Sequence, residues 1–196
     1  RLWLKYDRIQ DAALQRPYAT AFTAIVNTEN SPMRQVAVEE LQTGLQGLLG
    51  TKVPVQKQTS GKGDIVFQLN AQEQVGPEGY HIYRQGNQTI IAAKTEKGLL
   101  YGSFGLLRHL QTLRPLSELN ITTSPKVQYR VLNHWDNPNG TVERGYAGSS
   151  IWKWYDLPQV IDPRYKEYAR ANASIGINAT VVNNVNASAR FMTAEY

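Results

Sequence analysis

The sequence contains no cysteine among its 196 residues. That absence excludes disulfide-stapled scaffolds, cysteine-ligated zinc sites, iron–sulfur clusters and thiol catalysis. Long apolar runs are missing too, because stretches such as residues 99–101 are far too short to span a bilayer. The histidines His81, His109 and His134 are isolated, and none stands at a metal-ligand spacing from another histidine or a carboxylate. We therefore expect neither a membrane span nor a metal site.

Signals for phosphate binding and for export are also lacking. The segment Gly-Lys-Gly-Asp at residues 61–64 lacks the spacing of a phosphate-binding loop and precedes a predicted strand, where such a loop would precede a helix. No basic-then-apolar signal peptide opens the chain, and Arg1 is interpreted as a trimmed or truncated start. The sequence leaves the cellular compartment open.

Charge of one sign is not concentrated anywhere. Lysine and arginine outnumber aspartate and glutamate by 21 to 16, which gives a net charge of +5, but the basic residues are scattered along the chain. We therefore expect no nucleic-acid partner, while a small acidic substrate is compatible with the charge. With 41% hydrophobic and 19% charged residues, the composition is that of a globular protein.

The first 125 residues alternate strand and helix signals. A helix is predicted over residues 32–49, because Ser31 can cap it, proline suits its first position, apolar residues recur at three-and-four spacing and Gly50 ends it. A second helix is predicted over residues 97–113, and its three glycines indicate close packing on a sheet. Strands are predicted over residues 2–6, 24–26, 53–55, 64–69, 80–83 and 89–93, with a hairpin turn at residues 86–87. We expect residues 1–125 to be an α/β layer domain with helices on one face of a mixed sheet.

The remaining residues differ in kind. Residues 114–126 have the proline, serine and threonine content of a linker. A strand over 127–136, a glycine- and aromatic-rich loop over 137–157, a helix over 162–174 and a strand over 177–185 predict a right-handed βαβ unit. Two β/α units cannot bury their own faces, so we expect residues 126–196 to be an incomplete second domain.

The densest group of chemically capable residues lies where these two strands end. The first strand changes from apolar to Asn-His-Trp-Asp at residues 133–136, and the second changes to Asn-Asn-Val-Asn at residues 183–186. Parallel strands with polar carboxyl ends are typical of the top face of a barrel enzyme. An aromatic face can pack there on a sugar ring while amides bind its hydroxyl groups; the alternative is a polar strand exit with a buried tryptophan.

Asp136 and Glu143 form a conceivable acid–base pair, because glycoside hydrolysis uses two carboxylates that flank the scissile bond. A separation of seven residues across a loop does not constrain their geometry. The sequence favours the alternative, in which these side chains hold the loop in shape through ion pairs and N–H contacts.

Several long motifs occur together in this chain. The most specific are Arg-Val-Leu-Asn-His-Trp-Asp-Asn at residues 130–137 and Gly-Thr-Val-Glu-Arg-Gly-Tyr-Ala-Gly at residues 140–148. Others lie at residues 2–6, 97–102, 168–178 and 182–186, so the set covers essentially the whole chain. In this order the motifs resemble the family 67 glycoside hydrolases, the xylan α-1,2-glucuronidases. Pro138-Asn139 departs from the acidic residue common in that family and puts only the local turn in doubt.

The resemblance implies an N-terminal α/β domain followed by a (β/α)8 TIM barrel, of which this chain supplies the first two β/α units. It implies an inverting glycoside hydrolase that removes 4-O-methyl-glucuronic acid from xylo-oligosaccharides derived from glucuronoxylan, with no metal or organic cofactor. The family's catalytic carboxylates lie later in the barrel, so no catalytic residue is transferred to this chain. By resemblance, Trp135 and Val185 are substrate-binding residues in the apolar wall of the glucuronic acid pocket. Whether the full-length enzyme is a homodimer stays open.

Two other classes of function remain. The chain can be a stand-alone carbohydrate-binding module without catalysis, with Trp135, Trp152 and Trp154 as stacking platforms. It can also be a structural or interaction domain that uses the α/β layer, for which no sequence feature speaks positively.

Overall fold

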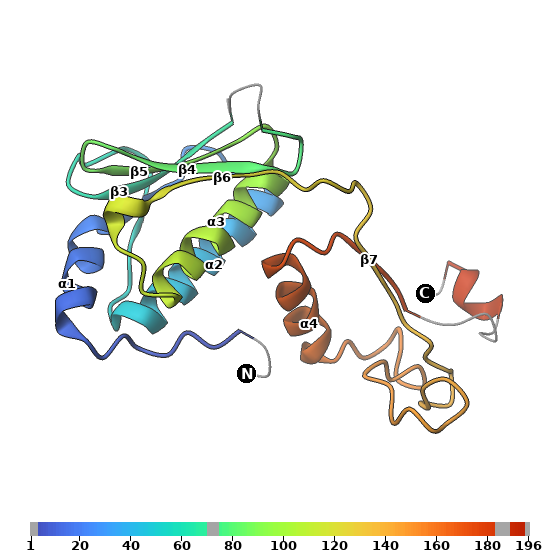
Figure 1. Cartoon of the computed structure of the whole chain (residues 1–196). Helices are drawn as coiled ribbons and strands as arrows, with labels where there is room; N and C mark the ends of the chain where they lie inside the picture. Colours follow the sequence, from blue (N-terminus) through green and yellow to red (C-terminus); the bar gives the residue numbers. More distant parts are fainter. Residues whose placement is uncertain (1–3, 70–74, 183–188, 195–196) are drawn as a thin grey trace. The chain divides into compact units, whose positions relative to one another are not determined.

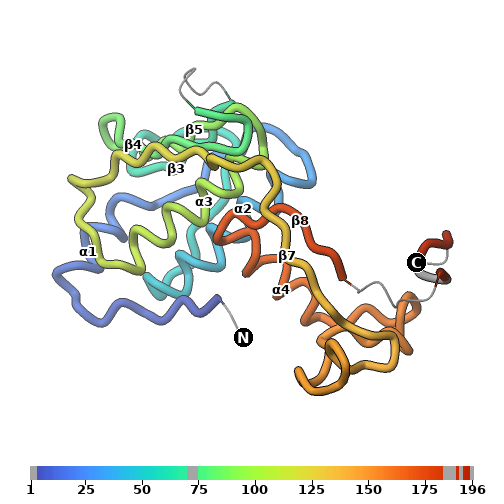
Figure 2. The backbone as a smooth tube through the Cα atoms, turned by 45° about the vertical axis from the view of Figure 1, so that its right-hand side comes forward, coloured from blue at the N-terminus to red at the C-terminus, as the bar shows by residue number. Residues whose placement is uncertain are grey.

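The structure is a computed structural model that describes residues 4–69, 75–182 and 189–194. The chain divides into two compact units: the first spans Lys5–Lys126, and the second holds the residues from Val127 on together with Leu4. Each unit has a sheet of its own, with six strands in the first unit and two in the second (Figure 1, Figure 2).

The first unit is built on a mixed sheet, as the sequence predicted. Its strands lie side by side in the order β2 (Val55–Gln56), β1 (Ala24–Val26), β3 (Asp64–Gln68), β5 (Gln88–Ala93), β4 (Tyr80–Gln85) and β6 (Asn120–Thr123). The pairs β1–β2, β1–β3 and β3–β5 are parallel, whereas β4 runs antiparallel to both β5 and β6. The predicted turn between β4 and β5 is confirmed, and Gly86 supplies its φ of +58°.

Two long helices cover one face of this sheet (Figure 1). Helix α2 (Pro32–Leu49) begins where the Ser31 side chain accepts a hydrogen bond from the Arg34 N–H, and it ends at Gly50, whose φ of 76° lies in the left-handed region. Helix α3 (Glu96–Gln111) begins after Thr95, whose hydroxyl accepts from the Gly98 N–H at 3.3 Å. The two predicted helices, and the capping residues predicted for the first of them, are confirmed.

The glycines of α3 bring this helix unusually close to the sheet. A Cβ atom on Gly98 would lie 2.4 Å from the carbonyl oxygen of Gly79, and one on Gly102 would lie 2.5 Å from Ile91 Cγ2. At either position a Cβ atom would force the neighbouring group to move. The close packing that these glycines predicted is confirmed.

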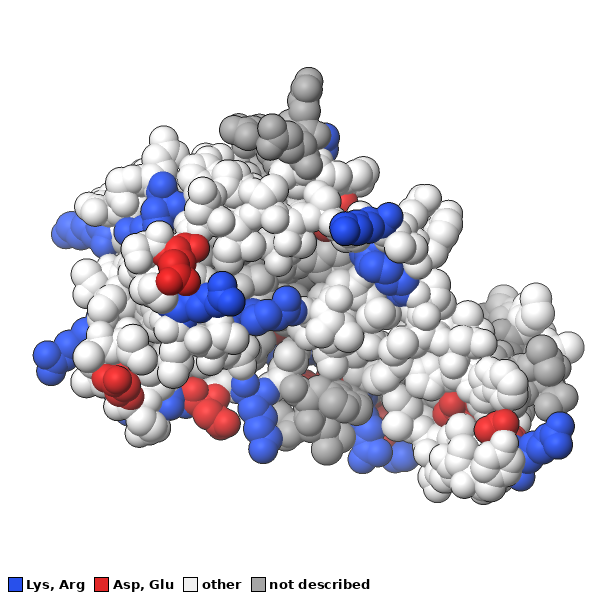
Figure 3. Space-filling view, viewed as in Figure 1, with Lys and Arg blue, Asp and Glu red and all other residues white. Residues whose placement is uncertain are grey.

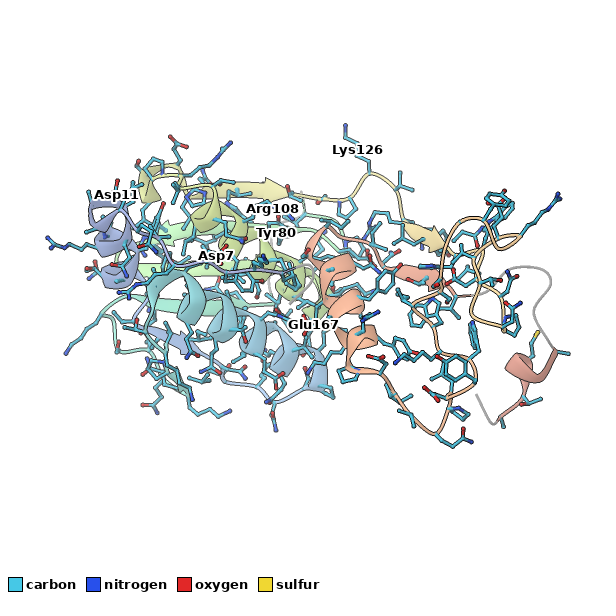
Figure 4. All side chains as sticks on the ribbon, turned by 90° about the horizontal axis from the view of Figure 1, so that it is seen from below. Asp7, Asp11, Tyr80, Arg108, Lys126 and Glu167 are labelled. Atoms are coloured by element: carbon cyan, nitrogen blue, oxygen red, sulfur yellow. The ribbon has the colours of Figure 1, made fainter. Side chains whose placement is uncertain are left out.

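One turn further along α3, Gly105 packs against the side chain of Tyr80 on β4. A Cβ atom on Gly105 would lie 2.6 Å from the Tyr80 hydroxyl oxygen, and Figure 4 labels Tyr80 together with Arg108 of α3. Burial raises the pKa of Tyr80 above its usual value, although the charge of Arg108 and a hydrogen bond with Thr123 act in the opposite direction. The phenol is therefore a neutral hydroxyl at the junction of α3 with the sheet.

A predicted strand at the start of the chain was wrong, and a helix there was missed. Residues 4–6 form no strand, and the other residues of that prediction lie outside the described part of the chain. Helix α1 (Ala12–Ala21) follows instead, capped by Asp11, whose carboxylate accepts from the Ala13 N–H at 2.8 Å. Pro17 lies inside this helix and removes one of its backbone donors, so the sequence pattern does not indicate a helix.

The predicted linker at residues 114–126 was also wrong. It carries a short 3₁₀ helix, η1 (Leu116–Glu118), and then β6, which pairs with β4. Strand β6 is an edge strand whose side chains are mostly exposed, so its sequence Asn-Ile-Thr-Thr is as polar as that of a linker. Its pairing partner, β4, is distant in the sequence, so the strand could not be predicted from local composition.

Asp64 is fully buried at the start of β3, and its carboxylate organises the preceding loop. It accepts hydrogen bonds from the backbone N–H groups of Ser60 at 2.7 Å and Gly61 at 2.9 Å, and from the hydroxyl groups of Thr59 and Ser60. Burial acts to raise the pKa of Asp64, but these hydrogen bonds outweigh it and lower the pKa. The Gly-Lys-Gly-Asp segment therefore folds around a carboxylate of its own.

The second unit has the predicted order of strand, helix and strand. Strands β7 (Val131–Asn133) and β8 (Ala179–Val181) pair in parallel, and helix α4 (Pro163–Ser174) lies between them in the sequence. A 3₁₀ helix, η2 (Ala189–Met192), follows. Both strands are shorter than predicted, and apolar side chains such as Val131 and Val181 are exposed rather than buried. Two strands offer too few neighbours to cover both faces of a sheet.

We expect Gly98→Ala to lower the free energy of unfolding. The added methyl group would meet a backbone carbonyl that cannot turn aside, and overpacking of this kind costs about 1–3 kcal/mol. We expect the upper part of that range, which exceeds the ~1 kcal/mol that alanine gains in helix propensity. Gly76→Ala is the matched control, because its nearest neighbour atom would be 3.7 Å away. Urea unfolding of both variants checks the prediction, and an unchanged midpoint for Gly98→Ala would contradict it.

We expect Asp64→Asn to destabilise the chain by about 1–3 kcal/mol at neutral pH, because the amide replaces a carboxylate that accepts several buried hydrogen bonds. The folded-state pKa of Asp64 is lowered, so its stabilisation is complete above the unfolded value of about 3.9 and is lost as the pH falls through the lower folded value. The difference between wild type and variant should therefore shrink below about pH 4. Urea unfolding from pH 7 to pH 3 measures it, and a constant difference would refute the assignment.

Candidate functional site

The candidate site lies at the carboxyl ends of β7 and β8. Because the two strands are parallel, with Asn133 opposite Val181, their ends meet at one edge of the small sheet. The pairing extends one residue further, since the His134 N–H donates to the Val181 carbonyl at 2.9 Å. Val185 and the other residues of the predicted Asn-Asn-Val-Asn motif lie outside the described residues. The site is therefore described from the β7 side.

Trp135 follows β7 and presents its side chain to solvent. Its side chain is 54% exposed, whereas the neighbouring residues His134 and Asp136 are largely buried. Side chains of an extended segment alternate between its two sides, so His134 and Asp136 point one way and Trp135 the other. An exposed indole at a strand end has the shape and polarity to stack on a sugar ring. Its role as a pocket wall stays a prediction.

The loop after Trp135 is an ordered ribbon. Asp136 pairs with Val142 and Thr141 with Ser149 in antiparallel bridges. Asn137 ties its turn, because its N–H donates to the Thr141 carbonyl at 2.8 Å and its side chain donates to the Thr141 hydroxyl at 2.9 Å. These bonds join the two arms of the loop that follows Trp135.

Asp136 and Glu143 are both engaged within this ribbon and its surroundings. The Asp136 carboxylate lies 3.3 Å from His134 Nδ1 and is only 4% exposed. Glu143 has a positive φ of 57°, and its carboxylate accepts a hydrogen bond from the Tyr146 hydroxyl, which raises the pKa of Tyr146. These contacts are of the loop-shaping kind that the sequence favoured over an acid–base pair.

An aromatic cluster behind Trp135 was missed by the sequence analysis. His134 Nε2 makes a hydrogen bond with the hydroxyl group of Tyr168 on α4, and the two rings meet edge to face. Trp152 packs against the rings of His134, Tyr165 and Tyr168, with centroids 5.8, 4.8 and 5.6 Å away. The spacing of two tyrosines three residues apart on a predicted helix was the available signal, but it did not say that the strand end was their partner.

The stacking platform of three tryptophans is not formed. Trp154 is only 7% exposed and presents no face to solvent. Trp152 is half-buried among the three rings of the aromatic cluster, so its faces contact protein. Of the three tryptophans proposed as platforms, only Trp135 is exposed.

The described residues hold no group of three or more histidine, cysteine, aspartate or glutamate side chains that could bind a metal. His81 Nε2 lies 2.8 Å from the Asn120 side-chain oxygen, and buried His109 lies 3.1 Å from the Pro115 carbonyl, with its pKa lowered by burial. Lysine and arginine side chains are dispersed on the face shown in Figure 3, with acidic side chains between them. None of the helices in the described ranges has both the length and the apolar character that a membrane span requires.

Two family models match consecutive parts of the chain. Residues 2–106 match the Glycosyl hydrolase family 67 N-terminus, and residues 109–196 match the Glycosyl hydrolase family 67 middle domain.

Curated relatives are similar to the chain along almost all of its length. It is 33% identical to the probable alpha-glucuronidase A of Aspergillus terreus, over 98% of this chain and 24% of the relative. It is 36% identical to the probable alpha-glucuronidase A of Neosartorya fischeri, over 97% and 24%. It is 31% identical to the alpha-glucuronidase A of Emericella nidulans, over 98% and 25%. The chain thus spans about a quarter of the length of these relatives.

Solved structures of two further glycosidases share the fold. One is a family GH115 4-O-methyl-alpha-glucuronidase with specificity for decorated arabinogalactans, with a TM-score of 0.58, 15% identity, and coverage of 81% of this chain and 25% of that chain. The other is a GH138 enzyme that targets pectin rhamnogalacturonan II, with a TM-score of 0.57, 18% identity, and coverage of 80% and 18%.

Proposed function

Because this chain belongs to glycosyl hydrolase family 67, we propose that it forms the N-terminal part of an inverting α-glucuronidase. The complete enzyme removes 4-O-methyl-glucuronic acid from xylo-oligosaccharides during xylan breakdown. The observation that carries this proposal is the consecutive match of the two family models, which together span nearly every residue. Relatives named alpha-glucuronidase along 97–98% of the chain support it.

We further propose that residues 1–125 are an N-terminal α/β domain and that residues 126–196 begin a (β/α)8 barrel. The parallel pairing of β7 with β8, with α4 between them in sequence, is the unit from which such barrels are built. The exposed apolar side chains of both strands fit a sheet that has further neighbours in the complete enzyme. In barrel enzymes the active site lies at the carboxyl ends of the strands, which is where Trp135 stands.

The proposed division of labour within the enzyme follows from the contacts of the carboxylates. Inverting hydrolysis needs one carboxylic acid that protonates the leaving oxygen and one carboxylate that activates water, roughly 6.5–9.5 Å apart. The Asp136 carboxylate contacts His134, and the Glu143 carboxylate accepts a hydrogen bond from Tyr146. We therefore assign neither carboxylate to that chemistry. In this proposal the chain contributes binding surface, with Trp135 beside the 4-O-methyl group, and the carboxylates come from other segments.

A carbohydrate-binding module without catalysis is the competing function. The exposure of Trp135 favours some affinity for sugars. Trp154, however, is buried and cannot stack on a sugar, so the module would lack one of its three proposed stacking residues. Titrating the chain with aldouronic oligosaccharides and following tryptophan fluorescence separates the two. A saturable change with micromolar affinity would favour the module, and a flat titration would favour the enzyme portion.

The chain by itself should release no 4-O-methyl-glucuronic acid from a substituted xylo-oligosaccharide. A barrel needs about 250 residues, and the proposed barrel portion here ends far short of that. Chromatography of the products, with the complete enzyme as a positive control, measures the release. Turnover by the purified chain would overturn the proposed division between binding surface and catalytic carboxylates.

In the complete enzyme, Trp135→Ala should lower kcat/KM roughly thirtyfold, which corresponds to a lost aromatic contact of about 2 kcal/mol. Thermal stability should change little, because the indole is exposed. Trp154→Ala is the matched control: its side chain is buried, so the variant should lose about 3–5 kcal/mol of stability. A Trp135→Ala enzyme with normal activity would remove this residue from the site.

A further inference from the structure

The His134 imidazole is held at both of its nitrogen atoms. Nδ1 lies 3.3 Å from the Asp136 carboxylate, and Nε2 makes a hydrogen bond with the Tyr168 hydroxyl group. A carboxylate only accepts, so Nδ1 presents its N–H to Asp136. The imidazole therefore links Tyr168 on α4 to Asp136, the residue after Trp135.

The two residues joined by the Nδ1 contact lie on either side of Trp135 in the sequence. His134 precedes it and Asp136 follows it, and both of their side chains are turned away from solvent while the indole is turned toward it. The backbone is hydrogen-bonded at two of these residues, because the His134 N–H donates to the Val181 carbonyl and the Trp135 carbonyl accepts from the Glu143 N–H at 2.7 Å. These bonds tie the backbone on both sides of the Trp135 Cα atom.

We propose that His134 is a positioning residue, which presents the Trp135 indole to the glucuronic acid and does not itself touch the sugar. Asp136 and Tyr168 set the orientation of its ring. The part that concerns the sugar rests on the proposed function. The part that concerns Trp135 rests on the hydrogen bonds and alternation within the second unit alone.

A role in packing alone gives a different expectation. Packing depends on the volume of the tyrosine ring, whereas positioning depends on its hydroxyl group. Tyr168→Phe keeps the ring against His134 and Trp152 and removes the hydroxyl group that is hydrogen-bonded to Nε2. Tyr165→Phe is the matched control on the same helix, because it also contacts Trp152 but its hydroxyl accepts from the Lys153 N–H at 2.8 Å.

The first measurement needs no sugar. The four tryptophans are labelled with 5-fluorotryptophan, and the Trp135 fluorine resonance is assigned with Trp135→Phe. Tyr168→Phe should shift or broaden that resonance by more than its linewidth, and Tyr165→Phe should leave it in place. Urea unfolding of both variants establishes that they fold equally well. If Tyr168→Phe leaves the Trp135 resonance unchanged, the proposal is wrong.

A second variant keeps the proposal testable if Tyr168→Phe does not fold. Asp136→Asn replaces the carboxylate beside Nδ1 with a neutral amide, which weakens the contact that orients the His134 ring. The Trp135 resonance should respond in the same way as in Tyr168→Phe. No response in either folded variant overturns the positioning role.

The second measurement uses the complete enzyme and a xylo-oligosaccharide that carries 4-O-methyl-glucuronate at its non-reducing end. Trp135 would contact the sugar in ground state and transition state alike, so Tyr168→Phe should raise KM about fivefold with little change in kcat, the effect of one lost hydrogen bond. An unchanged KM beside a shifted Trp135 resonance would overturn the link to the sugar. A wild-type enzyme that does not hydrolyse this substrate would refute the proposed function and leave the positioning of Trp135 to the fluorine measurement.

Discussion

The parallel pairing of β7 with β8 is the constraint on which the candidate site depends. It brings the ends of two strands, almost fifty residues apart in the sequence, to one edge of a sheet. It also extends to His134, whose N–H donates to the Val181 carbonyl. From that point the chain alternates, with His134 and Asp136 directed toward α4 and the loop, and Trp135 toward solvent. A slip of one residue in this register would exchange the sides and bury the indole.

The first unit depends on a different constraint, the close approach of α3 to β4 and β5. Glycines at three positions, about one helical turn apart, let the helix lie against the Gly79 carbonyl and the side chains of Ile91 and Tyr80. Burial of apolar side chains along this contact supplies most of the driving force, since Leu99 and Ile91 are completely buried. Hydrogen bonds from the preceding loop to the Asp64 carboxylate hold the backbone where β3 begins.

The sequence predicted elements whose signals are local. Helix α2 is an example, because Ser31, Pro32 and Gly50 each act on the backbone within one turn. Helix α1 was missed because Pro17 contradicts the pattern, and β6 because an exposed edge strand has the composition of a loop. The use of Trp135 in binding stays a prediction, and the aromatic cluster around the neighbouring His134 was not predictable. Tyr168 lies 34 residues beyond His134, and only the fold brings the two together.

The central claim is that this chain supplies the Trp135 side of a glucuronic acid pocket and leaves catalysis to other segments of the enzyme. A crystal structure of the complete enzyme with a 4-O-methyl-glucuronate-bearing xylo-oligosaccharide tests that claim most directly. The account predicts that the indole of Trp135 lies in van der Waals contact with the sugar, at about 4 Å between carbon atoms, and that Asp136 still faces His134. A sugar bound away from an indole that remains in solvent, or one held directly by the Asp136 carboxylate, would contradict it.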